Sequence, residues 1–396
     1  MRIALAKSTA LMVLRAVRQS LGERAAWFIG SHRTSDFSPQ LPDGRQRWSK
    51  STIYAPSLGL DSTYLEQHHP NVMVPTEGHR LRGKSLACTV LSGTIPSDSF
   101  IDTGNGLLVP CPELLFVQMA PLMLPAVHAL LGYELCGTYA RDPHDPHMGD
   151  VQFGVPAVTS VEKISIYIDS CSYVPGIEQA RKNLAAVRDN AWSPAEALIA
   201  AFSVLPVWAL GYGMGDVSLN QRVATPEKLA SVTTAMSRVP DIRYVGTPVG
   251  INYDGRGHLD LDKLISAIRQ NPNDEDVARQ TSDIIRDKAY DDLLRDRELA
   301  AGGLVILPTT SRDLYARGGL DALMLQTAAA IERFSDKDMS SVSLAMRVPA
   351  IRRERQELVW SLLQWEYGKA LLRKLAAANH ATIPATARIV DTTIEL

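Results

Sequence analysis

The sequence predicts an α/β protein with three parts: an N-terminal α+β region, a core in which helices flank a mixed sheet, and a helical C-terminal extension. Residues 31–85 are rich in Ser, Pro and Gly and carry short β-rich groups, which favours strands and loops. Further along, helix-like and strand-like segments alternate, as is typical of helices packed on a sheet. We place the three parts at residues 1–190, 191–333 and 334–396.

Length and charge limit the classes of function. A chain of 396 residues is long enough for two or three domains, each with its own apolar core. The formal charge is −2, from 41 basic and 43 acidic side chains, so a surface that binds nucleic acid would have to be local. The cysteines are well separated and lie in apolar surroundings, which predicts buried free thiols in a reducing cytoplasm. They are Cys88, Cys111, Cys136 and Cys171.

The first twenty residues predict an amphipathic helix. Lys7, Arg15 and Arg18 interrupt every apolar run, so the segment is not a signal peptide, and no run of the chain approaches the length of a membrane span. We therefore expect a cytoplasmic protein without membrane association. The apolar positions near helical spacing are Leu5, Leu11, Leu14 and Val17.

Residues 86–140 predict strand, turn, strand and one long buried helix that begins with Pro112 at its first position. Residues 158–190 look helical and charged. Between them, the loop DPHDPHMGD offers side chains of metal-ligating type, but its spacing fits no standard metal site. We interpret this loop as structural; the side chains are Asp142, His144, Asp145 and His147.

A strong helix start follows in SPAEALIAAFSVL, with Ser193 as N-cap, Pro194 at the first helical position and Glu196 at the third. Two strand-like segments come next, DIRYVG and PVGINYDG. A helix then ends at Gly302-Gly303 and leads into the strand LVILPTT, before another helix near 319–333. This order brings strand ends and a helix start together.

The candidate site lies at these ends. Hydrolysis of a phosphodiester with a divalent metal needs two or three oxygen ligands on rigid elements. Simpler interpretations stay open for each residue: a helix cap, the start of a strand after Pro240, a hairpin turn, or a loop residue. Asp292 and Arg295 are expected to form an ordinary helical ion pair. The candidate residues are Glu196, Asp241, Asn252, Asp254 and His258.

Several ordered motifs resemble the very-short-patch-repair-like branch of the PD-(D/E)xK nuclease superfamily. They are SPAE, then PD followed eleven residues after Asp241 by NYDG and a histidine, then DLLRDRELAAGGLVIL. The last motif is matched by Asp292, Arg295, Leu299 and Gly303. The segments GNGLLVPCPELLFVQMA and LGYELCGTYARDP resemble the N-terminal region of actinobacterial proteins with this domain and, more distantly, AbiEi-type abortive-infection antitoxins.

The resemblance implies a restriction-endonuclease-like core that acts on DNA in repair or defence. It implies Mg²⁺ held by Asp241, Glu196 and Asn252, with Asp254 and His258 holding or deprotonating water. However, Asn252 stands where the family has Glu, and a neutral amide is a weaker ligand that cannot act as a general base. The alternative is a catalytically inactive nuclease-fold protein that binds DNA or a protein partner as a regulator or antitoxin-like component. Self-association stays open.

The basic C-terminal segment is interpreted as an amphipathic helix rather than a phosphate-binding surface. Its expected solvated residues are Arg352, Arg353, Arg355, Lys369, Arg373 and Lys374. Its expected inward-facing residues are Trp360, Leu363, Trp365 and Leu371.

Overall fold

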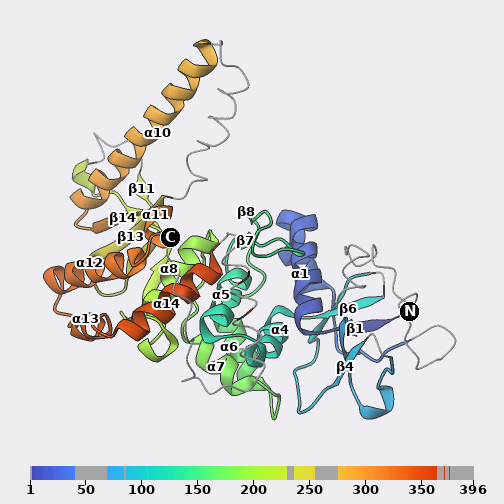
Figure 1. The fold of residues 1–396 in the computed structure, drawn as a ribbon. Helices are drawn as coiled ribbons and strands as arrows, with labels where there is room; N and C mark the ends of the chain where they lie inside the picture. Colours follow the sequence, from blue (N-terminus) through green and yellow to red (C-terminus); the bar gives the residue numbers. More distant parts are fainter. Residues whose placement is uncertain are drawn as a thin grey trace. The chain divides into compact units, whose positions relative to one another are not determined.

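A computed structural model shows the mixed α/β architecture that the sequence predicts (Figure 1). The structure describes residues 2–40, 69–83, 86–104, 106–229, 236–254 and 275–363, together with Ala370 and Lys374. The chain divides into two compact units: Met1–Ala197 with Ser361–Leu396, and Leu198–Trp360.

The first unit is built on a mixed six-stranded sheet of order β2-β5-β6-β1-β3-β4. β1 lies at its centre, parallel to β6 and antiparallel to β3. These strands are β1 (Ile3–Leu5), β2 (Arg33–Thr34), β3 (Asn71–Val74), β4 (Ala87–Val90), β5 (Phe100–Asp102) and β6 (Leu107–Pro110). A separate antiparallel pair joins β7 (Tyr139–Ala140) to β8 (Gln152–Phe153).

Helices α1 (Lys7–Leu21) and α4 (Pro112–Met119) contact this sheet. The other α-helices are α2 (Ala25–Ser31), α5 (Pro125–Leu135), α6 (Val161–Ser170) and α7 (Ile177–Leu184). The short 3₁₀ helices are η1 (Gly22–Arg24), η5 (Glu77–His79) and η6 (Ala120–Leu122). Every residue of α4 is buried, as expected for a helix that is apolar all round.

Two helix predictions in this unit need correction. The predicted N-terminal helix begins only at Lys7, because Ile3–Leu5 pair with β6 and β3 as a central strand. The single long helix expected from Pro112 is two helices, α4 and α5. Pro121 and Pro125 separate them, since proline supplies no backbone N–H to continue the helical hydrogen bonds.

A buried charge cluster ties α1 to α5. Arg15 donates two hydrogen bonds to the Glu134 carboxylate, at 2.8 and 2.6 Å. Arg18, which is 1% exposed, donates to the backbone oxygens of Glu134, Gly137 and Pro156. Buried charges are tolerated only when they are paired in this way. The two arginines that break the apolar runs of the N-terminal sequence therefore lie inside the unit.

The second unit holds a four-stranded sheet of order β14-β13-β12-β9. β9, β12 and β13 are antiparallel neighbours, and β14 runs parallel to β13. The strands are β9 (Val217–Leu219), β12 (Ile242–Tyr244), β13 (Val249–Asp254) and β14 (Val305–Thr310). A small antiparallel ribbon, β10 (Val223–Ala224) with β11 (Ser237–Arg238), lies between β9 and β12 in the chain.

The order of helix, strands, helix and closing strand is the predicted one, with β9, β10 and β11 as additional strands. The elements are α8 (Pro194–Val204), α10 (Glu275–Ala301), α11 (Ser311–Tyr315), α12 (Gly319–Phe334), α13 (Ser340–Ala345) and α14 (Pro349–Leu362), with η7 (Val207–Ala209) and η8 (Glu227–Leu229). As predicted, α10 ends just before Gly302-Gly303, and the N–H of Leu304 bonds back to the carbonyl of Leu299.

One face of the second sheet is apolar. Alternate residues of a strand point to opposite faces, so Ile242, Tyr244 and Ile251 share one side, and all three are buried. The hydroxyl of Tyr244 lies 2.9 Å from Ser203 Oγ in α8 and 3.7 Å from Met324 Sδ in α12. We call this side, packed against α8 and α12, the apolar face.

The opposite side is the polar face. It carries Arg243 and Asn252, adjoined by Asp241 at the start of β12. Asn252 contacts Asp296 of α10, which places α10 on this side. Helices α8 and α12 therefore pack against the apolar face, whereas α10 contacts the polar face through the bond between Asn252 and Asp296.

The predicted C-terminal extension is helical where it is described, and α13 and α14 up to Trp360 lie in the second unit. Arg352 and Arg353 are exposed as expected, but the prediction for Arg355 was wrong: it is 1% exposed and donates to the carbonyl oxygens of Leu210 and Gly211. Trp360 and Leu363 are buried as expected, and Lys374 is exposed. Trp365, Lys369, Leu371 and Arg373 lie outside the described residues.

Candidate functional site

Glu196 starts helix α8 as a capping residue. Its N–H donates to Ser193 Oγ at 3.2 Å, and the Ser193 hydroxyl lies 2.9 Å from Glu196 Oε1. Glu196 Oε2 also accepts from the N–H of Trp192 at 3.1 Å. These reciprocal bonds satisfy N–H groups that a helix start leaves unpaired. The predicted helix start is confirmed, and the carboxylate of Glu196 serves it.

Asp241 and Asn252, eleven residues apart in one predicted pattern, lie side by side. Ile242 pairs with Ile251 in the antiparallel β12–β13 ladder, so the residues just outside this pair are opposite each other. The N–H of Asp241 donates to Asn252 Oδ1 at 3.1 Å. In return, the N–H of Tyr253 donates to Asp241 Oδ2 at 2.6 Å. Side chain and backbone thus fix the orientation of both candidate residues.

The sequence interpretation missed a third member, Asp296 of α10. Its Oδ1 accepts a hydrogen bond from Asn252 Nδ2 at 3.4 Å. Asn252 is 1% exposed, whereas the Asp296 side chain is 38% exposed. One available signal was the spacing of Asp292 and Asp296, since residues four apart lie on one face of a helix. A partly exposed carboxylate therefore lies next to the buried amide.

Charged side chains of both signs surround this group. Arg295 lies 3.5 Å from Asp292 and 3.8 Å from Asp296. The first contact confirms the expected helical ion pair, which is worth a few tenths of a kcal/mol. Arg238 of β11 approaches α10 at Glu298, with Nε 2.5 Å from Oε2. The site therefore combines carboxylates with guanidinium groups that balance their charge.

Two predicted site residues are only partly placed. Asp254 ends β13, and its backbone pairs with Thr310 of β14, at the same end of the sheet as Asn252. Its side chain, and His258 entirely, lie outside the described residues. Within the described ranges, no three His, Cys, Asp or Glu side chains come together as a metal-binding group.

The histidine- and aspartate-rich loop after β7 is organised by its own turns. Asp142 Oδ1 accepts from the N–H groups of His144 and Asp145, at 2.8 and 2.7 Å. Asp145 Oδ1 accepts from the N–H of Met148 at 3.0 Å. These are the turn-forming bonds that aspartate commonly makes with following residues. The structural interpretation of this loop is confirmed.

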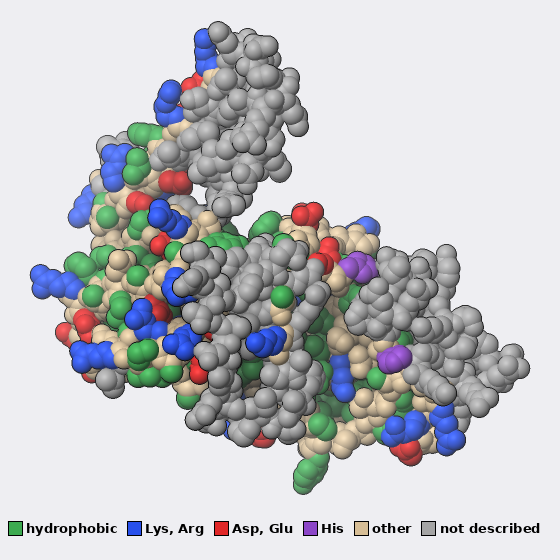
Figure 2. Space-filling view, in the orientation of Figure 1, with side chains coloured by type: hydrophobic (Ala, Val, Ile, Leu, Met, Phe, Trp, Pro, Cys, Tyr) green, Lys and Arg blue, Asp and Glu red, His purple; other side chains and the backbone are tan. Residues whose placement is uncertain are grey.

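Among the described residues seen in Figure 2, Lys and Arg side chains are interspersed with Asp and Glu over the second unit. This agrees with the near-neutral formal charge. None of the helices in the described part of the chain has both the length and the apolarity needed to cross a bilayer.

Comparison with known proteins gave no match to any family model, to any curated protein or to any solved structure.

Proposed function

We propose that this chain is a Mg²⁺-dependent DNA endonuclease-like protein of the cytoplasm with its centre at Asp241, Asn252 and Asp296. The observation that carries the proposal is the hydrogen-bonded pairing of Asp241 with Asn252. These two residues belong to one ordered pattern of the sequence, eleven residues apart, and they meet where β12 begins and β13 ends. A role in DNA repair or in defence against foreign DNA follows from the motif resemblance.

The chemistry of the donor set fits Mg²⁺. This ion prefers oxygen ligands and is commonly bound through one or two carboxylates, with waters and substrate phosphates completing its shell. Asp241 and Asp296 would supply the carboxylates, and Asn252 an amide oxygen if it turned away from the N–H of Asp241. A bound ion would activate water and offset the charge that develops on the phosphate. Two carboxylates are enough for such a Mg²⁺ site, so a third acidic residue is not required.

A second candidate function is supported by the state of Asn252. Its oxygen accepts from Asp241 and its amide nitrogen donates to Asp296, so both polar atoms are used inside the protein. Glu196, which the family resemblance made a metal ligand, serves as a helix cap. These contacts favour a non-catalytic protein that keeps the fold for binding DNA or a protein partner, as a regulator or antitoxin-like component.

A plasmid nicking assay with Mg²⁺ or Mn²⁺ distinguishes the two candidates. The wild type should convert supercoiled plasmid to the open circle only when the metal is present, and Asp241→Ala should reduce this to the EDTA background. Asp283→Ala is the control: Asp283 is an exposed acid of α10 outside the candidate site, so this variant should cleave like the wild type. Equal cleavage by wild type and Asp241→Ala would end the nuclease proposal.

The Asn252→Glu variant provides a second test that distinguishes the two candidate functions. Cleavage that exists only in this variant would show that the site lacks one carboxylate, which supports the non-catalytic candidate for the natural chain. Fluorescence anisotropy with a labelled duplex, measured without metal, then tells DNA binding from binding of a protein partner. A wild type that neither cleaves nor binds the duplex leaves only the protein-partner form of the second candidate.

A further inference from the structure

Polar contacts help to attach helix α10 to the second sheet. It covers the polar face, which presents Arg243 and Asn252, with the aliphatic side chain of Ile306 from β14 beside Gly250. Of the α10 side chains that are described, Leu299 is the one that is buried. Tyr290 and Leu293 are 60% and 63% exposed. Among the α10 side chains that are described, full burial of an apolar side chain is thus confined to the C-terminal turn of the helix.

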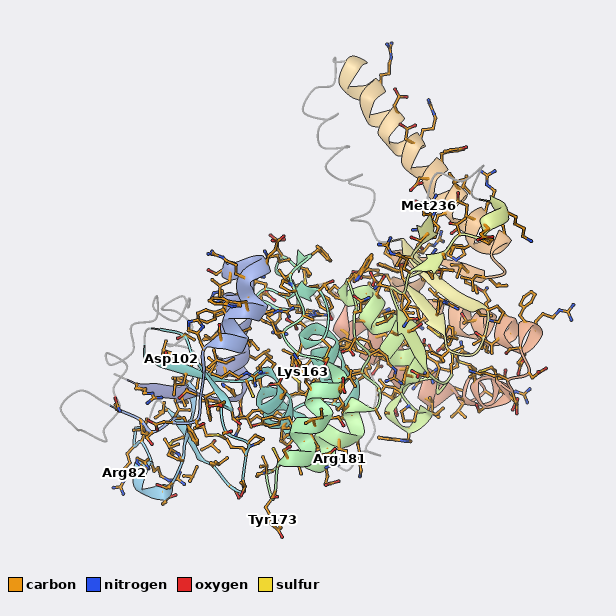
Figure 3. The ribbon with its side chains drawn as sticks, turned by 180° about the vertical axis from the view of Figure 1, so that it is seen from behind. Arg82, Asp102, Lys163, Tyr173, Arg181 and Met236 are labelled. Atoms are coloured by element: carbon orange, nitrogen blue, oxygen red, sulfur yellow. The ribbon has the colours of Figure 1, made fainter. Side chains whose placement is uncertain are left out.

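Three polar contacts join α10 to β13 and to the β10–β11 ribbon. Arg238 Nε lies 2.5 Å from Glu298 Oε2, and its Nη1 lies 3.5 Å from Asp291 Oδ1. The third contact joins Asn252 to Asp296 at 3.4 Å. The side chains of Arg238 and Glu298 are only 14% and 8% exposed, so water screens this pair less than a surface pair. Arg238 thus connects the β10–β11 ribbon, next to Met236 in Figure 3, with two turns of α10.

The C-terminal end of α10 has the features of a hinge. Gly302 and Gly303 follow the helix directly, and Gly303 has a φ of 86°, a conformation that glycine adopts without strain. A side-chain carbon at Gly303 would meet nothing within 4 Å, so the surroundings leave room for the backbone to turn. In Figure 1 α10 extends away from its own sheet toward its N-terminal end. Rotation at the glycines would break the bond from the Leu304 N–H to the Leu299 carbonyl and lift the helix from the polar face, on the side of the sheet away from α8 and α12.

We propose that α10 is an arm latched by Arg238, which swings about Gly302-Gly303 and so uncovers Asn252 and the neighbouring Asp241. Salt screens ion pairs but does not weaken apolar packing, so added salt opens this arm while the apolar face stays closed. A phosphodiester backbone would act in the same way, because it competes with Glu298 and Asp291 for the guanidinium of Arg238. The control of access to Asp241 rests on the proposed function, whereas the displacement of the helix does not.

Thiol labelling tests the displacement in the full chain without DNA or metal. Leu299→Cys places a thiol under α10, and Ala328→Cys in α12 is the matched control on the apolar face; both native side chains are 2% exposed. Labelling by a maleimide is followed by peptide mass spectrometry, which separates these sites from the natural cysteines. Between about 50 mM and about 1 M NaCl, labelling at position 299 should accelerate about tenfold, and labelling at position 328 should not change.

The latch is tested in the Leu299→Cys background. Arg238→Gln should make labelling fast at low salt and remove most of its salt dependence. Arg222→Gln is the control: Arg222 is exposed and donates to Ser237 Oγ of the same ribbon, so its loss should leave both the rate and its salt dependence unchanged. If the cysteine variants do not fold, hydrogen exchange of the wild type replaces labelling, with residues 286–301 compared with 320–334. Labelling at 299 that is as slow and salt-independent as at 328, or an Arg238→Gln variant without effect, would overturn the latch. A negative nicking assay would not.

Discussion

Asp321 and Arg355 form a buried ion pair between α12 and α14, with Arg355 Nη1 2.9 Å from Asp321 Oδ1. The hydroxyl of Tyr212 donates to the same carboxylate oxygen at 2.8 Å, and the Arg355 guanidinium lies 4.0 Å above the Tyr212 ring. Arg352 reaches the other oxygen at 3.0 Å. One carboxylate therefore links two helices and the segment after η7, and it makes α14 part of the second unit.

Removing this carboxylate should destabilise the protein strongly. Asp321→Asn leaves the Arg355 charge buried without its counter-ion, which typically costs about 3–5 kcal/mol of unfolding free energy. Urea unfolding followed by circular dichroism measures the change. Asp336→Asn, an exposed acid just beyond the end of α12, is the control and should stay within about 0.5 kcal/mol of the wild type. A similar loss in both variants would contradict the assigned role of Asp321.

Glu134 should make the stability of the first unit depend on acid. Burial, the largest single effect, would raise the pKa of this carboxyl, but Arg15 together with Arg141 and Arg18 outweighs burial and lowers the pKa from 4.5 to about 2. A lowered folded-state pKa stabilises above the unfolded value, and this contribution is lost as pH falls from about 4.5 through about 2. The pH dependence of urea unfolding over this range should be shallower in Glu134→Gln. An unchanged slope would show that Glu134 does not titrate in this way.

The stability that depends on neutral His128 should be lost at higher pH than the stability that depends on ionised Glu134. Burial lowers its pKa to about 4, although its hydrogen bond to the carbonyl of Phe116 acts in the opposite direction. The ring also lies 3.0 Å from Asn183 Nδ2, which suits a neutral imidazole that donates from Nε2 and accepts at Nδ1. Stability should therefore fall as pH drops from about 6.5 through about 4. An NMR titration of the ring proton that is missing in His128→Gln measures this directly; a midpoint near 6.5 would contradict the buried neutral state.

The helix cap at α8 should be measurable by conservative substitution. Ser193→Ala should cost about 1 kcal/mol of unfolding free energy, the usual value for loss of an N-cap hydroxyl. Glu196→Gln should cost less than Glu196→Ala, because the amide oxygen can still accept from the N–H of Trp192. Glu162→Ala, an exposed acid in the first turn of α6, is the control. Equal losses for the Gln and Ala variants at 196 would argue against the capping bond.

Local signals predicted local structure well. The Ser-Pro-x-Glu start of α8 and the Gly-Gly end of α10 each depend on residues within one helical turn, and both are confirmed. The short strand Ile3–Leu5 was missed because its neighbour β6 lies about a hundred residues further along the chain. The division between α4 and α5 was visible in Pro121 and Pro125, but the apolar run around them dominated the interpretation.

The same contrast between local signals and contacts distant in sequence applies to the candidate site. Asp241 and Asn252 could be predicted as neighbours because consecutive strands tend to pair. Asp296 could not be assigned, since its contact with Asn252 depends on how α10 docks on the polar face. Arg355 was placed on the solvated face for a similar reason: only the position of Asp321 on another helix explains its burial. Residues whose role depends on the docking of helices are the ones that pattern reasoning missed.

The difference between the two faces of the second sheet also bears on how this protein can change over evolutionary time. On the apolar face, a substitution at Ile251 opens a cavity, and one at Tyr244 also leaves the buried Ser203 hydroxyl without this hydrogen-bond partner. Selection for folding alone therefore restricts such substitutions. Half-exposed Asp296, on the polar side, can vary at little cost to folding. Acidic groups can therefore be gained or lost around Asn252 while the scaffold persists. Lineages that share this fold are expected to differ in chemistry before they differ in structure.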